Sequence, residues 1–291
     1  MAIPVDFELD RRLVRTHFNR SVPTADKADF LAREVSRRMA ERLDYIRVAP
    51  QRILDLGCGT GRDLPGFAQR YPEAERIGID FAAALLGTAR GQSGFLQRLL
   101  GRRMPQLACA DAEALPLQRA SVQMVWSNLM LNWFHEPMPA LREMHRVLAV
   151  DGLLMFSTLG PDTLRELRSA LPAMQGERVH RFIDMHDLGD CLLNAGFAEP
   201  VMDMEVITLT YTEVDALLEE LQQAGATNAS TARPRGLSGK DNWQQARQNY
   251  ERLRKDGRLP ATFEIVYGHA WKTAPKKLDD GRNIIEFKPR K

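Results

Sequence analysis

The sequence contains one segment in which an acid and three glycines are spaced as a ligand-binding loop requires. In ILDLGCGTG (53–61), Asp55 precedes Gly57 by two residues, and Gly59 and Gly61 follow at the same interval. A strand-like apolar run leads into the glycines, and a helix-like pattern follows them. Glycines allow positive φ angles and let a ligand approach the backbone N–H groups that begin a helix. The segment therefore predicts a loop that wraps a small molecule.

The acid distinguishes between two classes of ligand that bind glycine loops. Dinucleotide sites need G-x-G-x-x-G, but the sixth position counted from Gly57 or Gly59 is Arg62 or Leu64. The pattern here is D-x-G-x-G-x-G, which suits a ligand with an ammonium group near the loop rather than a pyrophosphate. S-adenosyl-L-methionine (SAM) is such a ligand, and Asp55 is placed to bind its amino group.

Two more acids follow the next two strand-like segments. Asp80 ends the second segment, where its carboxylate can bind both ribose hydroxyls of SAM. Asp111 follows the third segment and can accept a hydrogen bond from the adenine amino group, while Ala112 and Glu113 line the ring edge. Ligands of open α/β sheets bind outside the carboxyl ends of the strands, so the three acids together predict SAM binding. The residues predicted to bind SAM are Asp55, Gly57, Cys58, Gly59, Gly61, Asp80, Phe81, Asp111, Ala112, Glu113, Ser127, Asn128 and Arg20.

Short apolar segments that alternate with amphipathic ones must position these residues. Strands are predicted at 52–56, 76–80, 106–110, 122–126, 152–158, 202–210 and 262–271. Helices are predicted at 27–43, 62–70, 137–149, 162–171 and 186–195, and an interrupted helical stretch is predicted at 212–257. This alternation predicts an α/β fold with a seven-stranded, mostly parallel, doubly wound, Rossmann-like sheet.

The same pattern predicts how the chain is divided. We expect an N-terminal lid and helix, a SAM-binding core, a helical cap inserted before the last strand, that strand itself and a charged tail. The corresponding ranges are 1–45, 46–211, 212–260, 261–272 and 273–291.

Composition and charge exclude several classes of protein. The 291 residues carry a net charge of +2, which gives no reason to expect nucleic acid or an anionic membrane as a partner. Cys58, Cys109 and Cys191 form no C-x-x-C pair, so neither a disulfide framework nor a metal site is expected. The N-terminus lacks the apolar segment of a signal peptide, and no run is long enough to span a bilayer. We therefore expect a cytoplasmic protein.

The segment after the fourth predicted strand, WSNLMLNWF (126–134), is expected to form the floor of the acceptor site. It lacks the N/D-P-P-Y/F motif found in many methyltransferases of amines or planar bases. No His–Asp pair is placed to deprotonate a hydroxyl. Trp126, Asn128 and Trp133 are candidates for positioning the acceptor, although Trp126 fits a core position equally well.

Five segments resemble the malonyl-acyl-carrier-protein O-methyltransferases of biotin synthesis, a family of class I SAM-dependent methyltransferases. They are FNR (18–20), WSNLMLNW (126–133), STLGPDTLRELR (157–168), AGATN (224–228) and GHAWK (268–272). The resemblance implies that the acceptor is the free carboxylate of a malonyl thioester carried by an acyl carrier protein. A carboxylate is ionised at neutral pH, so the reaction would need no general base. It would depend on orienting the reactants and on excluding water.

Basic residues are candidates for holding this acceptor, because arginine can bind a carboxylate through two parallel hydrogen bonds. Arg233 and Arg235, with Lys240, could do so or could form a solvated basic loop. Arg20 and His17 come from the N-terminal segment. A further group, which could face an acidic carrier protein or form an ordinary charged helix face, consists of Arg165, Arg168, Arg178 and Arg181.

Other functions remain open from the sequence. The FNR segment and PAT (260–262) also resemble the arginine hydroxylase-like assembly factors of mitochondrial complex I. The chain could thus be another methyltransferase or a hydroxylase of the same fold, or an assembly factor that binds SAM without catalysis. Turnover of SAM with a malonyl carrier protein distinguishes these functions.

Overall fold

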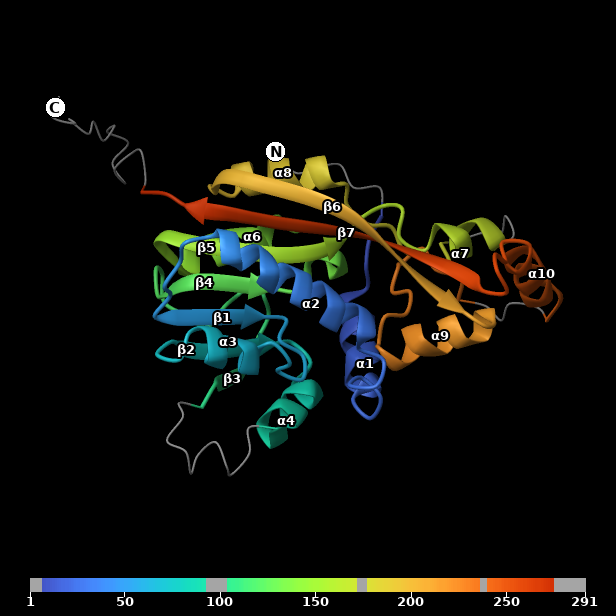
Figure 1. The fold of residues 1–291 in the computed structure, drawn as a ribbon, viewed down its shortest axis with the longest axis horizontal. Helices are drawn as coiled ribbons and strands as arrows, with labels where there is room; N and C mark the ends of the chain where they lie inside the picture. Colours follow the sequence, from blue (N-terminus) through green and yellow to red (C-terminus); the bar gives the residue numbers. More distant parts are fainter. Residues whose placement is uncertain (1–6, 93–103, 172–176, 236–239, 275–291) are drawn as a thin grey trace, which may run out of the picture.

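A seven-stranded sheet runs through the centre of the protein (Figure 1). The computed structural model describes residues 7–92, 104–171, 177–235 and 240–274. The strand order is β3-β2-β1-β4-β5-β7-β6. All neighbouring strands from β3 to β5 are parallel, whereas β7 is antiparallel to both β5 and β6. The predicted α/β fold with a mostly parallel sheet is therefore confirmed.

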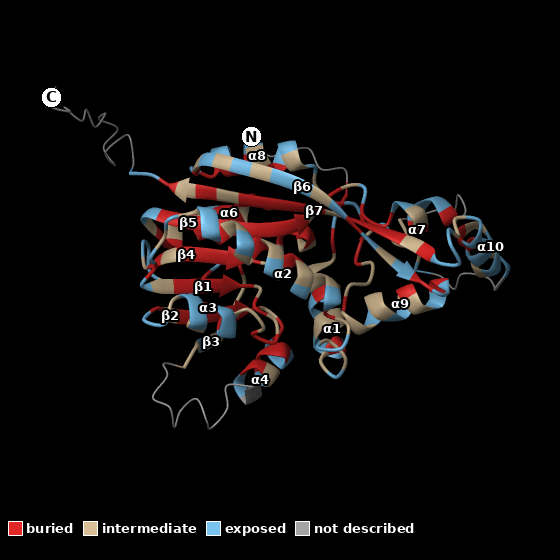
Figure 2. Ribbon diagram, in the orientation of Figure 1, coloured by how far each residue is buried: buried red, intermediate tan, exposed pale blue. Residues whose placement is uncertain are grey.

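Each predicted strand is present in the structure. The strands are β1 (Arg52–Leu56), β2 (Glu75–Asp80), β3 (Gln106–Cys109), β4 (Val122–Ser127), β5 (Leu148–Leu159), β6 (Ala198–Tyr211) and β7 (Leu259–Lys272). Figure 2 shows that β1, β4 and much of β5 and β7 are buried, whereas exposed residues recur along the edge strand β6. Near-continuous apolar runs such as RILDL are typical of strands that are covered on both faces, and these are the strands that the sequence predicts best.

The helices also follow the predicted pattern, with shifts at their ends. They are α1 (Arg11–Ser21), α2 (Phe30–Arg42), α3 (Leu64–Arg70), α4 (Ala83–Gln92), α6 (Met138–Val147), α7 (Arg165–Ala170), α8 (Met185–Asn194), α9 (Val214–Gln223) and α10 (Lys240–Glu251). The prediction of a helix to residue 149 is wrong, because β5 already begins at Leu148. Helix α1 was not predicted, although Asp10 caps it by accepting from Leu13 N at 3.0 Å. Residues 275–291 of the predicted tail lie outside the described residues.

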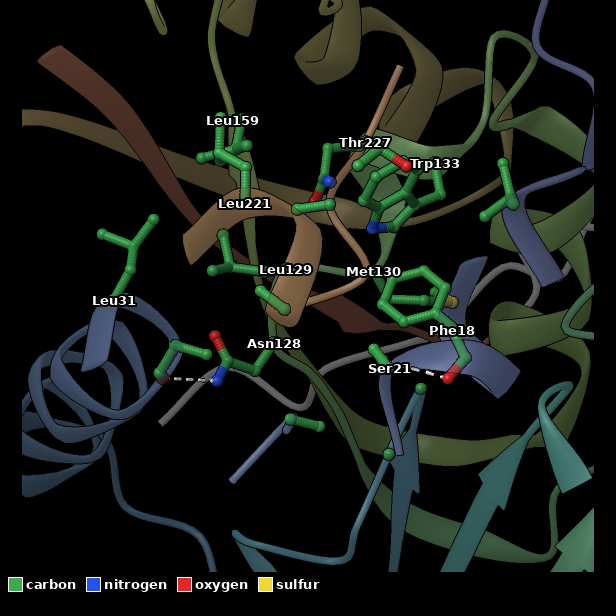
Figure 3. A pocket seen from close by; sticks show the side chains of 18 of the residues that line it. Phe18, Ser21, Leu31, Asn128, Leu129, Met130, Trp133, Leu159, Leu221 and Thr227 are labelled. Carbon is green, nitrogen blue, oxygen red and sulfur yellow. Dashed lines mark hydrogen bonds between the residues drawn. The ribbon is translucent and has the colours of Figure 1, made fainter. Parts of the chain in front are cut away.

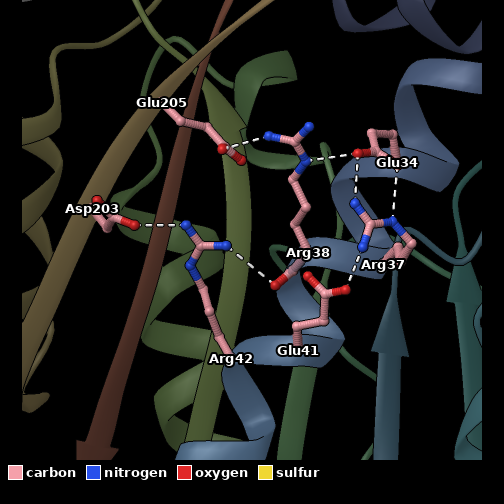
Figure 4. Close-up of polar contacts among 7 residues, drawn as sticks. All are labelled: Glu34, Arg37, Arg38, Glu41, Arg42, Asp203 and Glu205. Atoms are coloured by element: carbon pink, nitrogen blue, oxygen red, sulfur yellow. Dashed lines mark hydrogen bonds and ion pairs between the residues drawn. The ribbon is translucent and has the colours of Figure 1, made fainter.

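The N-terminal helix α2 crosses one face of the sheet and is tied to β6 by ion pairs (Figure 4). Arg38 Nη1 lies 2.5 Å from Glu205 Oε2, and Arg42 Nη2 lies 2.6 Å from Asp203 Oδ2. Single ion pairs near the surface contribute little to stability, so the buried apolar stripe of α2 holds the helix to the sheet. The ion pairs join α2 to the edge strand β6.

The residues before α1 pair with the segment that follows α9. Asp10 N donates to Ala229 O at 2.8 Å, and Thr231 N donates to Glu8 O at 2.9 Å. Helices α7, α9 and α10 gather where β6 and β7 extend past the other strands (Figure 1). The N-terminal segment and the chain between β6 and β7 are therefore in direct contact.

Candidate functional site

The glycine loop has a backbone geometry that other residues adopt only with strain. The φ angles of Gly57, Gly59 and Gly61 are +77°, +54° and +78°. A Cβ at Gly57 would lie 2.6 Å from Met130 Cγ, whereas a Cβ at Gly59 would meet nothing within 4 Å. Since Gly59 lines a cavity, the open space beside it is where a ligand can approach the loop.

Asp55, near the end of β1, has a buried carboxylate oxygen that no described residue contacts as a donor. The residue is 2% exposed, and Oδ2 is the oxygen that lacks a partner. Burial, with the charges of Asp63 and Asp80, raises the pKa of Asp55 well above its usual range. Burying an unpaired carboxylate costs free energy unless a cation or a hydrogen-bond donor binds it. The site is therefore complementary to an ammonium group.

Asp80, at the end of β2, supports the loop directly. Its Oδ2 accepts from Gly59 N at 2.9 Å, and its Oδ1 accepts from Ala82 N at 2.8 Å. Burial raises the pKa of Asp80, and the backbone hydrogen bonds partly oppose this shift. A carboxylate can accept about four hydrogen bonds, so Asp80 can fix the loop and still bind hydroxyl groups in the cavity that it lines.

The third acid, Asp111, forms an ion pair with a residue of α1 that was not predicted. Arg11 Nη2 lies 2.6 Å from Asp111 Oδ1, and Arg11 Nη1 pairs with Glu113. Glu113 N donates to Asp111 Oδ1 at 3.0 Å. Glu113 therefore belongs to a contact with α1, whereas Asp111 and Ala112 line the cavity. No sequence spacing links residue 11 to residue 111, so only the fold reveals this pair.

A cavity of about 380 Å³ joins the three acids to an apolar chamber. Figure 3 shows Leu31 of α2, Leu159 of β5 and Leu221 of α9 lining it, with Phe18 and Trp133 further along. The volume lies in the range of sites for small molecules. One part of the wall is acidic and the other is apolar, so the cavity can hold a charged nucleoside beside a second, drier site.

Nine of the residues predicted to bind SAM line this cavity, and the others do not. Those in the wall are Asp55, Gly57, Cys58, Gly59, Asp80, Phe81, Asp111, Ala112 and Asn128. Gly61 packs closely against α4, where a Cβ would lie 3.0 Å from Ala89 Cβ. Ser127 is fully buried behind the wall, and Arg20 is exposed at the end of α1. Gly61, Glu113, Ser127 and Arg20 therefore lie outside the cavity wall, and their assignment to the SAM site stays a prediction.

The three candidates for positioning the acceptor lie in two different places, the cavity wall and the core. Asn128 and Trp133 line the cavity. Trp126 is 1% exposed in the hydrophobic core, and its Nε1 donates to Asp63 Oδ2 at 2.8 Å. Trp126 therefore takes the core position, one of the two alternatives that its sequence fits equally well, and does not line the cavity.

Arg233 and Arg235, the two candidates either for holding the acceptor carboxylate or for a solvated basic loop, do not line this cavity. Arg233 lines a second cavity of about 250 Å³, and its Nη1 donates to Ser230 O at 2.9 Å. Arg235 is exposed, and the side chain of Lys240 lies outside the described residues. Residues 229–231, just before Arg233, pair with residues 8–10 of the N-terminal segment. The two cavities share Leu167, Arg178, Leu218 and Asn228.

The other basic candidates have partners within the chain. His17 Nδ1 lies 2.6 Å from Thr227 Oγ1, and Arg165 Nη1 lies 3.4 Å from Asp162 Oδ2. Arg168 Nη1 donates to Pro161 O at 3.0 Å. These residues therefore do not form one unpaired basic face.

Two aromatic residues of the cavity were not predicted. Phe18 of α1 packs edge-on against Trp133, with ring centroids 5.1 Å apart, and covers the cavity. His180 is 5% exposed and packs against Trp133 and Phe182, with ring centroids 5.2 and 4.7 Å apart. Phe18 belongs to the FNR segment, which could have indicated it. Nothing in the sequence around His180 indicates that it is buried.

The structure also bears on metals, thiols and membranes. In the described ranges, no group of three or more His, Cys, Asp and Glu residues could hold a metal ion. Cys58, Cys109 and Cys191 are free, and burial raises the pKa of the Cys58 thiol, which keeps it neutral in the cavity wall. Among the described helices, none is long and apolar enough to cross a membrane.

The fold and the site together define a class I SAM-dependent methyltransferase. Residues 54–156 match the methyltransferase domain family. The crystal structure of the YcgJ protein from Bacillus subtilis has the same fold, with a TM-score of 0.57 at 15% identity, covering 82% of this chain and 99% of that one. The orphaned oxygen of Asp55 and the open space at Gly59 fit the cofactor, which is SAM.

Relatives of known name define the family more closely. The malonyl-[acyl-carrier protein] O-methyltransferase of Laribacter hongkongensis is 53% identical over 290 residues. The protein of the same name from Gallionella capsiferriformans is 50% identical over 285 residues, and each match covers 97% of both chains. The chain belongs to the malonyl-[acyl-carrier protein] O-methyltransferase family and is a SAM-dependent O-methyltransferase.

Proposed function

We propose that the protein transfers a methyl group from SAM to the free carboxylate of a malonyl thioester on an acyl carrier protein, in biotin synthesis. The observation that carries this proposal is the extent of similarity, because relatives with this printed name match nearly the whole chain. The match includes the insertion, which supplies Leu218, Leu221 and Thr227 to the cavity wall. Both the cofactor part and the apolar part of the cavity therefore lie within the part of the chain that matches these relatives.

We assign separate roles to the acids of the cavity. Asp55 binds the ammonium group of SAM, Asp80 binds the ribose hydroxyls, and Asp111 accepts from the adenine amino group. Helix α1 serves as a lid that Arg11 fastens through Asp111, and the insertion forms the cap. When bound, SAM supplies the methyl group: a bond forms from a carboxylate oxygen to the methyl carbon, and the bond from sulfur to that carbon breaks.

Gly59→Ala tests the role of the loop. A Cβ at Gly59 would occupy the open side of the loop, so we expect SAM affinity to fall at least tenfold by calorimetry. The positive φ should lower the free energy of unfolding by only about 1–2 kcal/mol. The matched control is Gly66→Ala on the exposed side of α3, where no positive φ is present. SAM affinity that stays unchanged in Gly59→Ala would place the cofactor away from the loop.

The acceptor reaches the methyl group from the apolar side. Its carboxylate is ionised at neutral pH, so the protein needs to orient it and to exclude water rather than to remove a proton. The buried acids Asp55, Asp63 and Asp80 would repel an anion at the cofactor end of the cavity. The leucines from α2, β5 and α9 provide a dry approach in which the carboxylate loses part of its hydration.

The second cavity is the entrance for the thioester arm. It shares four wall residues with the main cavity and lies against Arg233 and Trp243. Arg178 lines both cavities, so a cationic side chain lies where the entrance joins the chamber. An acidic carrier protein that docks at this entrance can reach the methyl group only through its arm.

Arg233→Ala tests this entrance. We expect the KM for malonyl carrier protein to rise by about three- to tenfold, because a partly exposed charge at a rim assists association more than chemistry. The kcat and the SAM affinity should stay the same, and the effect should shrink at high salt. Exposed Arg252→Ala is the matched control. If the KM does not change, the arm enters elsewhere.

Turnover tests the proposed reaction itself. Purified protein with methyl-labelled SAM and malonyl carrier protein should yield a labelled ester that base hydrolyses, and acetyl carrier protein, which lacks the free carboxylate, should yield none. Binding of SAM without transfer to the malonyl thioester would contradict the proposal and favour the assembly-factor function. The gene should also restore growth of a strain that needs biotin because it lacks this methyl transfer.

A further inference from the structure

One nitrogen in the cavity wall has no function in the cofactor site or in the core. His180 Nε2 is buried and has no hydrogen-bond partner among the described residues. The residue is 5% exposed and lines the main cavity. Its ring is held by aromatic contacts with Trp133 and Phe182. Buried polar atoms are nearly always paired in folded proteins, so an unpaired one beside a cavity indicates a ligand that completes it.

The position of His180 places it on the route of the acceptor. Arg178, Val179 and His180 all line the main cavity, and Arg178 also lines the entrance. The imidazole of His180, beside Trp133, thus lines the same cavity as the residue that joins that cavity to the entrance. The acids that surround the cofactor end, Asp55 and Asp80, lie on other elements, at the ends of β1 and β2.

The chemistry of a buried imidazole suits a carboxylate. Burial, with the nearby charge of Arg168, lowers the pKa of His180 to about 4, so the ring is neutral at pH 7. A neutral imidazole carries one N–H donor and one acceptor. A neutral donor can orient a carboxylate without neutralising the negative charge that the attacking oxygen needs, whereas a bidentate arginine would engage both oxygens.

We propose that His180 Nε2–H binds one oxygen of the acceptor carboxylate and leaves the other oxygen free to accept the methyl group. The inference rests on the proposed function and adds the residue that orients the acceptor. Trp133 and Phe182 hold the imidazole in place. The new oxygen–methyl bond forms on the free oxygen as the sulfur–methyl bond breaks, and no proton is transferred by His180.

Two substitutions separate this role from a structural one. His180→Phe keeps an aromatic ring that can pack against Trp133 and Phe182 but removes the donor. His180→Gln supplies an amide N–H near the position of Nε2. We expect His180→Phe to raise the KM for malonyl carrier protein by about 10- to 100-fold, the usual effect of losing a hydrogen bond to a charged group. The SAM affinity should change less than twofold, and His180→Gln should restore most of the KM.

A direct measurement covers the case in which His180→Phe does not fold. The imidazole ¹⁵N signals of the wild-type protein, assigned with His180→Gln, should shift when malonyl-pantetheine is added and should not shift with acetyl-pantetheine. Unchanged signals, or unchanged kinetics in a folded His180→Phe variant, would overturn the proposal. If the wild-type protein itself transfers no methyl group to the malonyl carrier, the proposed function fails, and that result is distinct from the failure of His180.

Discussion

Asp55→Asn is expected to lower SAM affinity by about 100-fold or more while raising the thermal stability of the ligand-free protein. The carboxylate is buried and one oxygen has no donor, so the ligand-free protein gains little from its charge. The amide keeps the shape of the side chain and removes the repulsion from Asp63 and Asp80. The same change removes the anion that meets the ammonium group of SAM. The SAM affinity measured by calorimetry should therefore fall, whereas the melting temperature of the ligand-free protein should rise.

The pH dependence of stability tests whether the buried charge of Asp55 destabilises the ligand-free protein. The pKa of Asp55 is raised in the folded protein, so the folded state binds more protons than the unfolded state between the two pKa values. Stability of the ligand-free protein should therefore fall as pH rises from about 4, the ordinary pKa of aspartate, toward the raised value. Asp55→Asn should show a smaller fall. In addition, at a pH below the raised pKa, SAM binding to the wild-type protein should release a proton, which appears as a buffer-dependent enthalpy that the variant lacks.

Asp63 offers a matched control for this prediction. It is also a buried carboxylate near the loop, but its oxygens accept from Ser36 Oγ and Trp126 Nε1, both at 2.8 Å. Because protein donors already meet it, Asp63→Asn should lower stability and should change SAM affinity far less than Asp55→Asn. Equal losses of affinity in the two variants would contradict a specific role of Asp55.

Asp80→Ala is expected to lower both SAM affinity, by about 100-fold, and the melting temperature. The substitution removes the acceptors of Gly59 N and Ala82 N, and each donor left unpaired costs about 1–3 kcal/mol. It also removes the carboxylate that we assign to the ribose hydroxyls. Asp80→Asn, which keeps one acceptor oxygen, should fall between the wild type and the alanine variant in both measurements. A lower melting temperature with unchanged SAM affinity would limit Asp80 to supporting the loop.

The cofactor end of the site could be predicted because its signals are local. A strand that is buried on both faces appears as a short apolar run, and the candidate ligand-binding residue lies at or just after the carboxyl end of that run. Asp55, Asp80 and Asp111 each follow this rule, and the structure brings all three to one cavity. Gly57 and Gly59 have the positive φ angles that glycine allows.

The acceptor end could not be predicted in the same way, because it is built from contacts between distant segments. Arg233 faces the second cavity because its loop pairs with residues 8–10, which are more than 200 positions earlier in the chain. The sequence pattern places Trp126 in a strand with its neighbours, but it does not show which residue accepts from the indole N–H. In the structure this acceptor is Asp63, so the indole is hydrogen-bonded in the core. Arg11 and His180 lie in segments that carry no motif. Their roles depend on tertiary packing.

The central claim is that SAM lies where β1, β2 and β3 end, with its ammonium group held by Asp55. A crystal structure with S-adenosylhomocysteine tests it most directly, since that product carries the same amino acid and nucleoside groups. The predicted result is the ligand's amino nitrogen within hydrogen-bond distance of Asp55 Oδ2, and its adenine beside Asp111 and Ala112. A ligand that occupies another part of the protein, or one whose amino group faces away from Asp55, would contradict the account.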